Sequence, residues 1–377
     1  MSSFGDLTAP KVEQTGPSDG DEFVYVDISS IDNQAKRIVD PKRLTPEVAP
    51  SRARQRLRKG DVLISMTRPN LNAVAIVPPD LDGAIGSTGF HVLRANDDVE
   101  PHWLYYAVQS SSFVKAMCDL VQGALYPAVR PKDIREYAIS PPPLAKQSEI
   151  VAELEKQFSR LDEAVANLQR VKANLKRYER ATIASLTNPG SFDACVSGTI
   201  ADIAISLDNL RKPVNKLERA KRPGNIPYLG ANGQTGWIDV PLFDEELVLV
   251  VEDETFVGRT DPFCYYFADP CWVNNHTHVL RARPEVVYAK YLNLALSYYP
   301  FIPLTTGSTG RRKLTKAALM TAPISVPSLK KQAEVINEVE RCLSIAREVE
   351  SEVDTNLKRA QALRQTTLSK AFSHRTF

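Results

Sequence analysis

Two long segments of the chain carry apolar residues at steps of three and four, the spacing that places them along one side of an α-helix. The first begins near Ile150 and ends before Asn188-Pro189-Gly190, a sequence that stops helices, and the second begins at Leu329. Neither contains an internal proline or glycine. The pattern predicts helices over 143–188 and 328–372, each about 65 Å long at 1.5 Å per residue. Because a single helix cannot bury such a stripe alone, each one needs a partner.

The start of each helix belongs to an internal repeat. Residues 139–155 read ISPPPLAKQSEIVAELE and residues 324–340 read ISVPSLKKQAEVINEVE, an offset of 185 with nine of 17 positions identical. The period is about half the chain, which indicates one duplicated unit rather than a solenoid of many repeats. If the two helices pair along their stripes, the second must run back toward the first, so we expect an antiparallel pair with a pseudo-two-fold relation.

The segments that precede the helices are rich in proline, glycine and aromatic residues. Short β-like runs lie at 23–26, 61–66 and 247–251 and are bounded by turn residues, while short amphipathic helices are expected at 101–121 and 285–299. The sequence therefore predicts an α+β fold with two globular domains separated by two long antiparallel helices. The expected division is 1–140, 141–190, 191–325 and 326–377, in the order globular, helical, globular, helical.

Composition and charge exclude several protein classes. The chain has 43% apolar and 24% charged residues, which is typical of a folded globular protein, and no apolar run long enough for a membrane span. We also expect no secretory leader, and the five scattered cysteines fit a reducing cytoplasm better than a disulfide framework. Since 47 basic residues face 45 acidic ones, any nucleic-acid role must rest on local clusters.

A chain with this order of domains and this duplication resembles the specificity subunits of Type I restriction-modification enzymes. The resemblance rests on the Pro-Leu-x-x-Gln opening of the first helix (143–147), with Ser328 in place of proline at the second. It also rests on the stretches GDVLISM (60–66), STGFHVLR (87–94), YLGANG (228–233) and WVNNHTHVL (272–280). The match spans essentially the whole chain, but the first domain lacks the usual tryptophan-containing lead-in.

The resemblance implies a non-catalytic subunit that reads double-stranded DNA. Each globular domain would be a target-recognition domain for one half of a bipartite sequence, and the helices would form a coiled-coil spacer. Two adenine methyltransferase (modification) subunits would dock on the helices, and a restriction subunit would join them. S-adenosylmethionine, ATP and Mg would be bound by those partners, so no cofactor or metal is expected in this chain.

Several apolar positions on the helices are candidates for helix pairing or for docking of a partner. Two of them, Phe158 and Tyr178, lie on the flanks of the stripe and are candidates for contact with a methyltransferase. The sequence does not show which of these positions serve helix pairing and which serve docking. The full set is Leu154, Phe158, Leu161, Leu168, Tyr178, Val339, Leu343, Val353 and Leu357.

DNA contact requires cations for phosphates and amide or guanidinium forks for base edges. The best candidate is the loop TTGSTGRRK (305–313), in which small and hydroxyl residues precede three cations; its expected contacts are Ser308, Thr309, Arg311, Arg312 and Lys313. The counterpart in the first half, QGALYPAVRPK (122–132), offers Tyr126, Arg130 and Lys132. The alternative for both is a solvated loop.

Other candidate contacts are weaker. Arg68 follows a predicted strand, and Asn232 with Gln234 could read adenine from a Gly-rich turn, although turn chemistry explains Asn-Gly equally well. Two runs of basic residues are further candidates for DNA contact, and the alternative for both is an ordinary solvated face. They comprise Arg52, Arg54, Arg56, Arg58 and Lys59 in the first domain, and Lys212, Lys216, Arg219, Lys221 and Arg222 in the second.

Features that suggest catalysis are poorly formed. Cys264, Cys271, His276 and His278 lack the short paired spacing of structural zinc sites, so core packing is the favoured interpretation. The sequence Asp261-Pro262-Phe263 only partly matches the loop of amino-methyltransferases, and no phosphate-binding loop is present. Two rival interpretations remain, a coiled-coil adaptor with no DNA role and a fused methyltransferase or nuclease.

Overall fold

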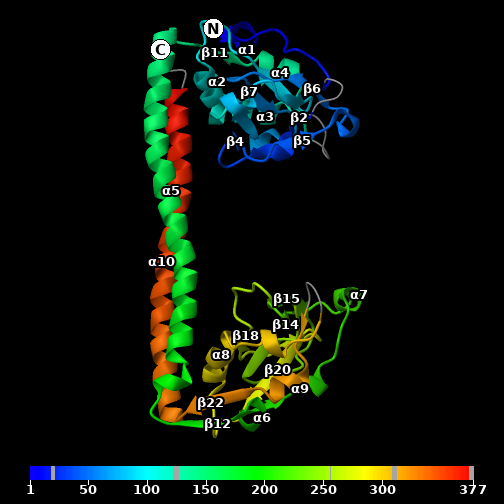
Figure 1. Ribbon diagram of the computed structural model, residues 1–377, viewed down its shortest axis with the longest axis vertical. Helices are drawn as coiled ribbons and strands as arrows, with labels where there is room; N and C mark the ends of the chain where they lie inside the picture. The colour runs from blue at the N-terminus through cyan, green and yellow to red at the C-terminus, as the bar shows by residue number, and fades with distance from the viewer. Residues whose placement is uncertain (18–21, 122–126, 255, 308–311, 373–377) are drawn as a thin grey trace. The chain divides into compact units, whose positions relative to one another are not determined.

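The computed structural model describes residues 1–377 except 18–21, 122–126, 255, 308–311 and 373–377. It divides into two compact units, and both long helices contribute a segment to each unit (Figure 1). Unit 1 contains Met1–Leu168 and Thr355–Phe377, and unit 2 contains Gln169–Asp354.

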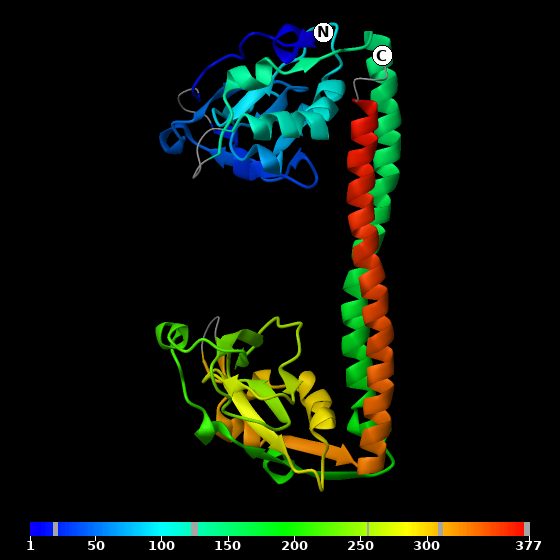
Figure 2. The ribbon, with the colours of Figure 1, turned by 180° about the vertical axis from the view of Figure 1, so that it is seen from behind.

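The two long helices are α5 (Leu144–Leu186) and α10 (Leu329–Ala371), each of 43 residues, which confirms the predicted spans to within two residues. Within unit 1, Arg364 of α10 forms an ion pair with Asp162 of α5 at 2.7 Å. Within unit 2, Lys172 of α5 forms an ion pair with Asp354 of α10, also at 2.7 Å. Figures 1 and 2 show that the paired segments run in opposite directions within each unit.

The globular part of unit 1 is built on small β-sheets. A three-stranded sheet has the order β10-β7-β8 and a four-stranded sheet the order β5-β2-β9-β6. Two further pairs, β1 with β11 and β3 with β4, complete the strands of this part. The strands are β1 (Ser2–Ser3), β2 (Phe23–Val26), β3 (Ile31–Asp32), β4 (Arg37–Ile38), β5 (Lys42–Leu44), β6 (Ala53–Arg56), β7 (Val62–Ser65), β8 (Val74–Ile76), β9 (Ile85–Ser87), β10 (Phe90–Leu93) and β11 (Ala138–Ile139).

The helix expected over 101–121 is two helices, α2 (Pro101–Ala107) and α3 (Ser111–Asp119). The break occurs because Ser110 adopts an extended conformation and its hydroxyl accepts from Phe113 N at 3.4 Å, which caps α3. The other helices of this part are α1 (Phe4–Leu7) and α4 (Pro131–Arg135). The side of α2 that carries Tyr106 packs on α5, since the rings of Tyr106 and Phe158 lie 5.6 Å apart.

Unit 2 has a four-stranded sheet of order β13-β20-β16-β18 and a three-stranded sheet of order β15-β14-β19. Two short pairs, β12 with β22 and β17 with β21, flank them. The strands are β12 (Cys195–Thr199), β13 (Ala204–Ser206), β14 (Ile226–Gly230), β15 (Gly233–Ile238), β16 (Leu247–Val251), β17 (Asp253–Glu254), β18 (Cys264–Phe267), β19 (Trp272–Val273), β20 (Thr277–Ala282), β21 (Arg312–Lys313) and β22 (Pro323–Pro327). The short helices are α6 (Ile200–Ile203), α7 (Lys216–Ala220), α8 (Ala289–Ser297) and α9 (Lys316–Met320).

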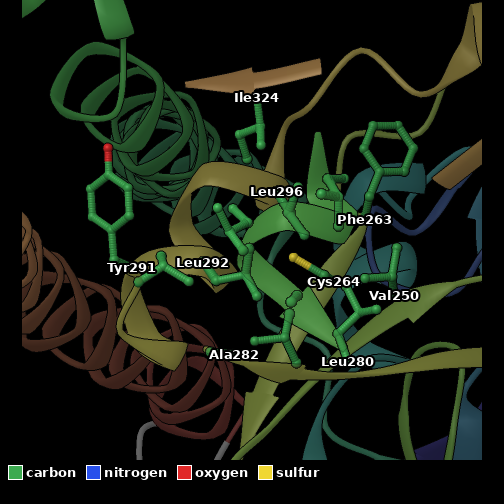
Figure 3. Close-up of a cluster of buried hydrophobic side chains, with 14 of the residues drawn as sticks. Val250, Phe263, Cys264, Leu280, Ala282, Tyr291, Leu292, Leu296 and Ile324 are labelled. Carbon is green, nitrogen blue, oxygen red and sulfur yellow. The ribbon is translucent and has the colours of Figure 1, made fainter. Parts of the chain in front are cut away.

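The core of unit 2 lies on both sides of α8. Leu292 and Leu296 pack with Val250 and Leu280 of the sheet, whereas Tyr291 projects from another side of α8 (Figure 3). The same buried cluster includes Ile183 of α5 and Val335 and Val339 of α10. One continuous core therefore joins the globular part to its helices, and burial of apolar area is what stabilises the attachment.

The internal repeat extends to the start of each globular part. In unit 1, β1 leads into α1, where the backbone N–H of Ser3 donates to Asp6 at 2.8 Å. In unit 2, β12 leads into α6, where Thr199 N donates to Asp202 at 2.7 Å. The two units share this capped turn although the sequences that form it differ, which supports the predicted duplication.

Candidate nucleic-acid interface

In unit 1, the structure brings the turn at Arg68 next to the segment that leads to Arg130. Arg68 adopts a left-handed conformation (φ 49°), and its backbone N–H donates to the carbonyl of Pro127 at 2.8 Å. A second backbone bond runs from Val129 N to Met66 O at 2.9 Å. Two candidates that lie about 60 residues apart in the chain are thus held on one surface, whereas Tyr126 lies outside the described residues.

Arg130 and Lys132 have different surroundings. The guanidinium of Arg130 forms a two-pronged contact with Asp133, at 2.8 and 3.1 Å, and this hydrogen bonding holds the pKa of the Asp133 carboxyl below its ordinary value. Lys132 is exposed and lies 3.5 Å from Glu136, also exposed. An exposed ion pair of this kind is weak, so the Lys132 ammonium can exchange its partner for a phosphate at little cost.

In unit 2, the candidate loop ends in β21, whose two residues are both anchored to the domain. Arg312 donates from Nε to the Thr305 hydroxyl at 2.6 Å and from Nη2 to the Thr305 carbonyl at 2.9 Å. Lys313 Nζ lies 3.2 Å from Glu252. Arg312 therefore closes the base of the loop, while Ser308, Thr309 and Arg311 lie outside the described residues.

A buried polar network lies beneath β21. His278 Nδ1 is 2.6 Å from the carboxylate of Asp208, and its Nε2 is 2.7 Å from the carbonyl of Leu314. Arg211 contacts Glu252 at 2.5 Å and the carbonyl of Thr277 at 2.8 Å. Burial would raise the pKa values of Asp208 and Glu252, but the hydrogen bonds and charges of their neighbours outweigh it and lower both. The network fastens the end of the candidate loop to β16 and β20.

Asn232 and Gln234 lie at the turn between β14 and β15, where Gly233 has φ 101°. Both side chains are exposed, but each has a local partner. Asn232 Oδ1 accepts from Arg259 at 2.9 Å, and Gln234 Nε2 donates to the carbonyl of Gly236 at 3.1 Å. The predicted Gly-rich turn is present, and each of the two exposed amides already has a hydrogen-bond partner within the domain.

A surface that combines cations with apolar side chains lies beside this hairpin, on α7 and β15. Leu217 and Trp237 are 80% and 54% exposed. The guanidinium of Arg219 lies 4.3 Å from the centre of the Tyr228 ring, and that of Arg222 lies 4.8 Å from Trp272. Lys212, Lys216 and Lys221 are also exposed, and none of them forms an ion pair with another described residue. We call this the α7–β15 surface.

Sequence reasoning identified the cations of the α7–β15 surface but missed Leu217 and Trp237. A tryptophan in a strand is normally taken as a core residue, because most strands have one buried face. Trp237 is exposed because it points from the solvent face of β15, whereas the next residue, Ile238, points to the other face and is fully buried. In the other basic run, at 52–59, buried and exposed residues alternate along β6. Ala53 and Gln55 are buried, and the arginines beside them face outward.

The helix positions predicted for pairing or docking fall into three groups. Leu154, Phe158, Val339 and Val353 are buried within their own unit. Leu161, Leu168, Leu343 and Leu357 are half-buried. Phe158 is not available to a partner protein, because Tyr106 and the guanidinium of Arg364 cover it, the latter at 4.2 Å from its ring. Tyr178 is 48% exposed and remains available.

The cysteines and histidines singled out as a weak zinc candidate have other partners. Cys264 Sγ lies 3.2 Å from the Asn293 carbonyl, and burial raises its pKa to about 12. Cys271 is buried with Leu229 and Phe243. No group of three or more potential metal ligands comes together within the residues that the structure describes. Nor does any helix among those residues have the length and apolar content to cross a bilayer.

Comparison with known proteins decides the family. Residues 18–176 and 196–353 both match the family described as Type I restriction modification DNA specificity domain. The chain belongs to this family. The two matches together cover most of the chain, and each includes part of a long helix, so the duplication seen in the sequence is a duplication of the family's domain.

Individual relatives agree with this assignment. The type I restriction enzyme StySPI specificity subunit of Salmonella potsdam is 23% identical over 311 residues, 74% of this chain and 66% of that protein. A Haemophilus influenzae protein named as a candidate type I restriction enzyme specificity subunit is 34% identical over 135 residues, 36% of this chain. The aligned part spans only 34% of that relative.

Solved structures extend the similarity to the whole chain. A chain from "Structural basis underlying complex assembly and conformational transition of the type I R-M system" is 26% identical, with a TM-score of 0.79 over 99% of this chain and 97% of that one. The HsdS subunit from Thermoanaerobacter tengcongensis is also 26% identical, with a TM-score of 0.56 over 99% and 96% of the two chains. The predicted fold class, two α+β domains and two long helices, is thus confirmed.

Proposed function

We propose that this protein is the DNA sequence-specificity subunit of a Type I restriction-modification system. Each globular domain reads one half of a bipartite DNA target, and the helices set the unread gap. The observation that carries the proposal is the match of both halves of the chain to a DNA specificity domain. An adaptor without a DNA role, the alternative interpretation of the sequence, has no comparable support.

The proposal assigns the chemistry to other subunits. This chain supplies recognition and no catalytic residue, and two adenine methyltransferase subunits and a restriction subunit assemble with it in the cytoplasm. S-adenosylmethionine, ATP and Mg are bound by those partners. Support for assembly comes from the structural relative whose description names a complex of the type I R-M system.

The α7–β15 surface is the proposed DNA contact of the second domain. Lys212, Lys216 and Lys221 are free to neutralise phosphates, which provides salt-sensitive affinity. Trp237 and Leu217 supply the apolar contact that recognises thymine methyl groups and sugar edges in a groove. In the first domain, Arg68 and Lys132 occupy the proposed contact surface, since backbone hydrogen bonds hold their segments together.

The proposed docking surface for a modification subunit lies on the helix segments of unit 2. Val171 and Tyr178 are exposed on α5, and Ile345 and Val349 are exposed on α10. The pair on α5 is seven positions apart and the pair on α10 is four positions apart, so the two residues of each pair share one helix face. Exposed apolar residues on a helix pair are the type of surface that a third or fourth helix covers in a bundle.

The spacer role has a direct test. We propose the division 1–140, 141–190, 191–325 and 326–377 for recognition domains and helical regions. Insertion of one helical turn between residues 165 and 175 is expected to lengthen the unread gap and to leave both half-sites unchanged. An altered half-site with an unchanged gap would contradict the spacer role.

The decisive experiment for the function is sequencing of modified bases in the genome of the native host, with and without this gene. A split adenine-methylated motif that disappears on deletion is the expected result, and it reads both half-sites and the gap at once. If deletion leaves the methylation pattern unchanged, binding of the purified protein to random duplexes at several salt concentrations tests the adaptor alternative. Absence of salt-dependent binding would support the adaptor.

A further inference from the structure

Two glutamines, Gln147 and Gln332, occupy the same position in the two copies of the repeat and make the same hydrogen bonds. Each lies in the first turn of its long helix, and the two are 2% and 0% exposed. Gln147 Nε2 donates to the carbonyl of Pro142 at 2.8 Å, and Gln332 Nε2 donates to the carbonyl of Pro327 at 2.8 Å. Each side chain therefore holds the proline-rich connection against the start of its helix.

The same side chains also reach across to the globular part. Gln147 Oε1 accepts from the backbone N–H of Glu100 at 2.9 Å, and Gln332 Oε1 accepts from that of Tyr288 at 3.0 Å. Glu100 and Tyr288 are the residues that cap α2 and α8, the helices that pack on the domain core. Each glutamine thus joins three elements, namely the long helix, the connection that precedes it and the first turn of a domain helix.

Among the described residues, these glutamine side chains bond to backbone atoms alone. Around Gln332 a further bond runs from Nε2 to the carbonyl of Val286 at 2.9 Å, and around Gln147 the corresponding bond runs to Asp98 at 3.4 Å. The proline partner is shared by the two halves, whereas the partners in the globular part differ in residue type, and the geometry is the same. Only a side chain with both an acceptor and a two-hydrogen donor at this length can form this set of bonds.

We infer that Gln147 and Gln332 are positioning residues that fix how each recognition domain is held on its helix, and so limit the gap that the protein accepts between half-sites. The apolar contacts between domain and helix are not directional and tolerate small shifts. Hydrogen bonds weaken steeply with angle and distance, so the buried amide selects one arrangement. The inference rests on the proposed function, in which the helices set the gap.

The test uses the full chain with its partner subunits in the native host and the variants Gln147→Met and Gln332→Met. Methionine keeps the volume of the side chain and removes its hydrogen bonds. Gln157→Met is the matched control, because Gln157 is an exposed glutamine of the same helix, and among the described residues its side chain bonds to Glu153 alone, at 2.7 Å. Methylation is measured on targets in which both half-sites are kept and the gap is changed by one base pair in either direction.

The expected result is that each variant methylates the off-length targets roughly fivefold to tenfold more, relative to the normal target, than the unchanged protein does, the effect of losing one or two hydrogen bonds. The half-site sequences and the Gln157→Met profile stay unchanged. A fall in total methylation with the same gap profile would show a merely structural role and overturn the inference.

A second kind of variant keeps the inference testable if the glutamine variants misfold. Tyr288→Pro removes the N–H that donates to Gln332, and Tyr288 already has φ −72°, which proline adopts. It is expected to relax the gap as Gln332→Met does, and an unchanged gap with normal methylation would count against the inference. If the unchanged protein yields no split motif, the proposed function itself fails, and this inference fails with it.

Discussion

The imidazole of His278 donates to the carboxylate of Asp208 across 2.6 Å, in a site where His278 is only 1% exposed. Its other ring nitrogen faces the carbonyl of Leu314, at 2.7 Å. Both partners are hydrogen-bond acceptors, so the buried ring bridges a carboxylate on one side and a backbone carbonyl on the other. Arg211 and Lys313 add two cations, and Glu252 adds a second carboxylate. The network therefore links strands β20 and β16 to the end of the candidate DNA loop.

Removal of His278 is expected to destabilise unit 2. The His278→Leu variant leaves Asp208 and the Leu314 carbonyl without their partner, at a cost of about 2–4 kcal/mol in the free energy of unfolding. His276→Leu is the matched control, because His276 is half exposed and lies 3.7 Å from Asp253. Urea unfolding followed by tryptophan fluorescence measures both, and equal losses in the two variants would contradict a stabilising role of the network.

The same network predicts a loss of stability in acid. The pKa values of Asp208 and Glu252 are lowered in the folded protein from ordinary values of 3.8 and 4.5. A carboxyl group with a lowered pKa contributes stability above its unfolded pKa, and that contribution is lost as the pH falls through the folded value. We therefore compare the urea midpoints of the unchanged protein and of Asp208→Asn. The difference between them is expected to have its largest value at pH 7 and to shrink below about pH 4. A difference that does not depend on pH between 7 and 3 would disprove this linkage.

Two aromatic residues on α5 should behave in opposite ways. Phe158 is buried against Tyr106 and Arg364, so Phe158→Ala is expected to cost about 3–5 kcal/mol of stability. Tyr178 is exposed, so Tyr178→Ala should change stability by less than about 1 kcal/mol. If Tyr178 docks a modification subunit, its loss weakens that association by about tenfold or more. Calorimetric titration of the two subunits measures this, and unchanged affinity would remove Tyr178 from the docking surface.

The α7–β15 surface predicts how DNA binding depends on salt. The double variant Lys216→Ala, Lys221→Ala is expected to reduce the slope of log affinity against log salt by about 1.8, since each phosphate contact contributes about 0.9. Trp237→Ala should leave that slope unchanged and weaken discrimination at one half-site. Lys156→Ala with Lys358→Ala, two exposed cations on the helices, serves as the control. A loss of slope in the control pair as large as in the α7–β15 pair would place the DNA elsewhere.

Much of the architecture was predictable from the sequence because it is written in local patterns. The helix stripes, the proline-rich starts and the break at Asn188 predicted α5 and α10 to within two residues. The runs at 23–26 and 247–251 are strands with those bounds. The duplication also followed from the sequence alone, since identical residues at a constant offset need no structure to be recognised. In these cases each residue's state depends on neighbours only a few positions away.

Other features were decided by contacts between distant segments. Gln147 and Gln332 were identical positions in an alignment of the halves, but their partners lie 44 to 49 residues away across the fold. His278 and Asp208 are separated by 70 residues, and their pairing could not be inferred from spacing. Phe158 and Tyr178 belong to the same apolar pattern, yet one is covered by its own domain and the other is exposed. Periodicity specifies which face of a helix is apolar, whereas only the packing of the folded chain specifies what covers it.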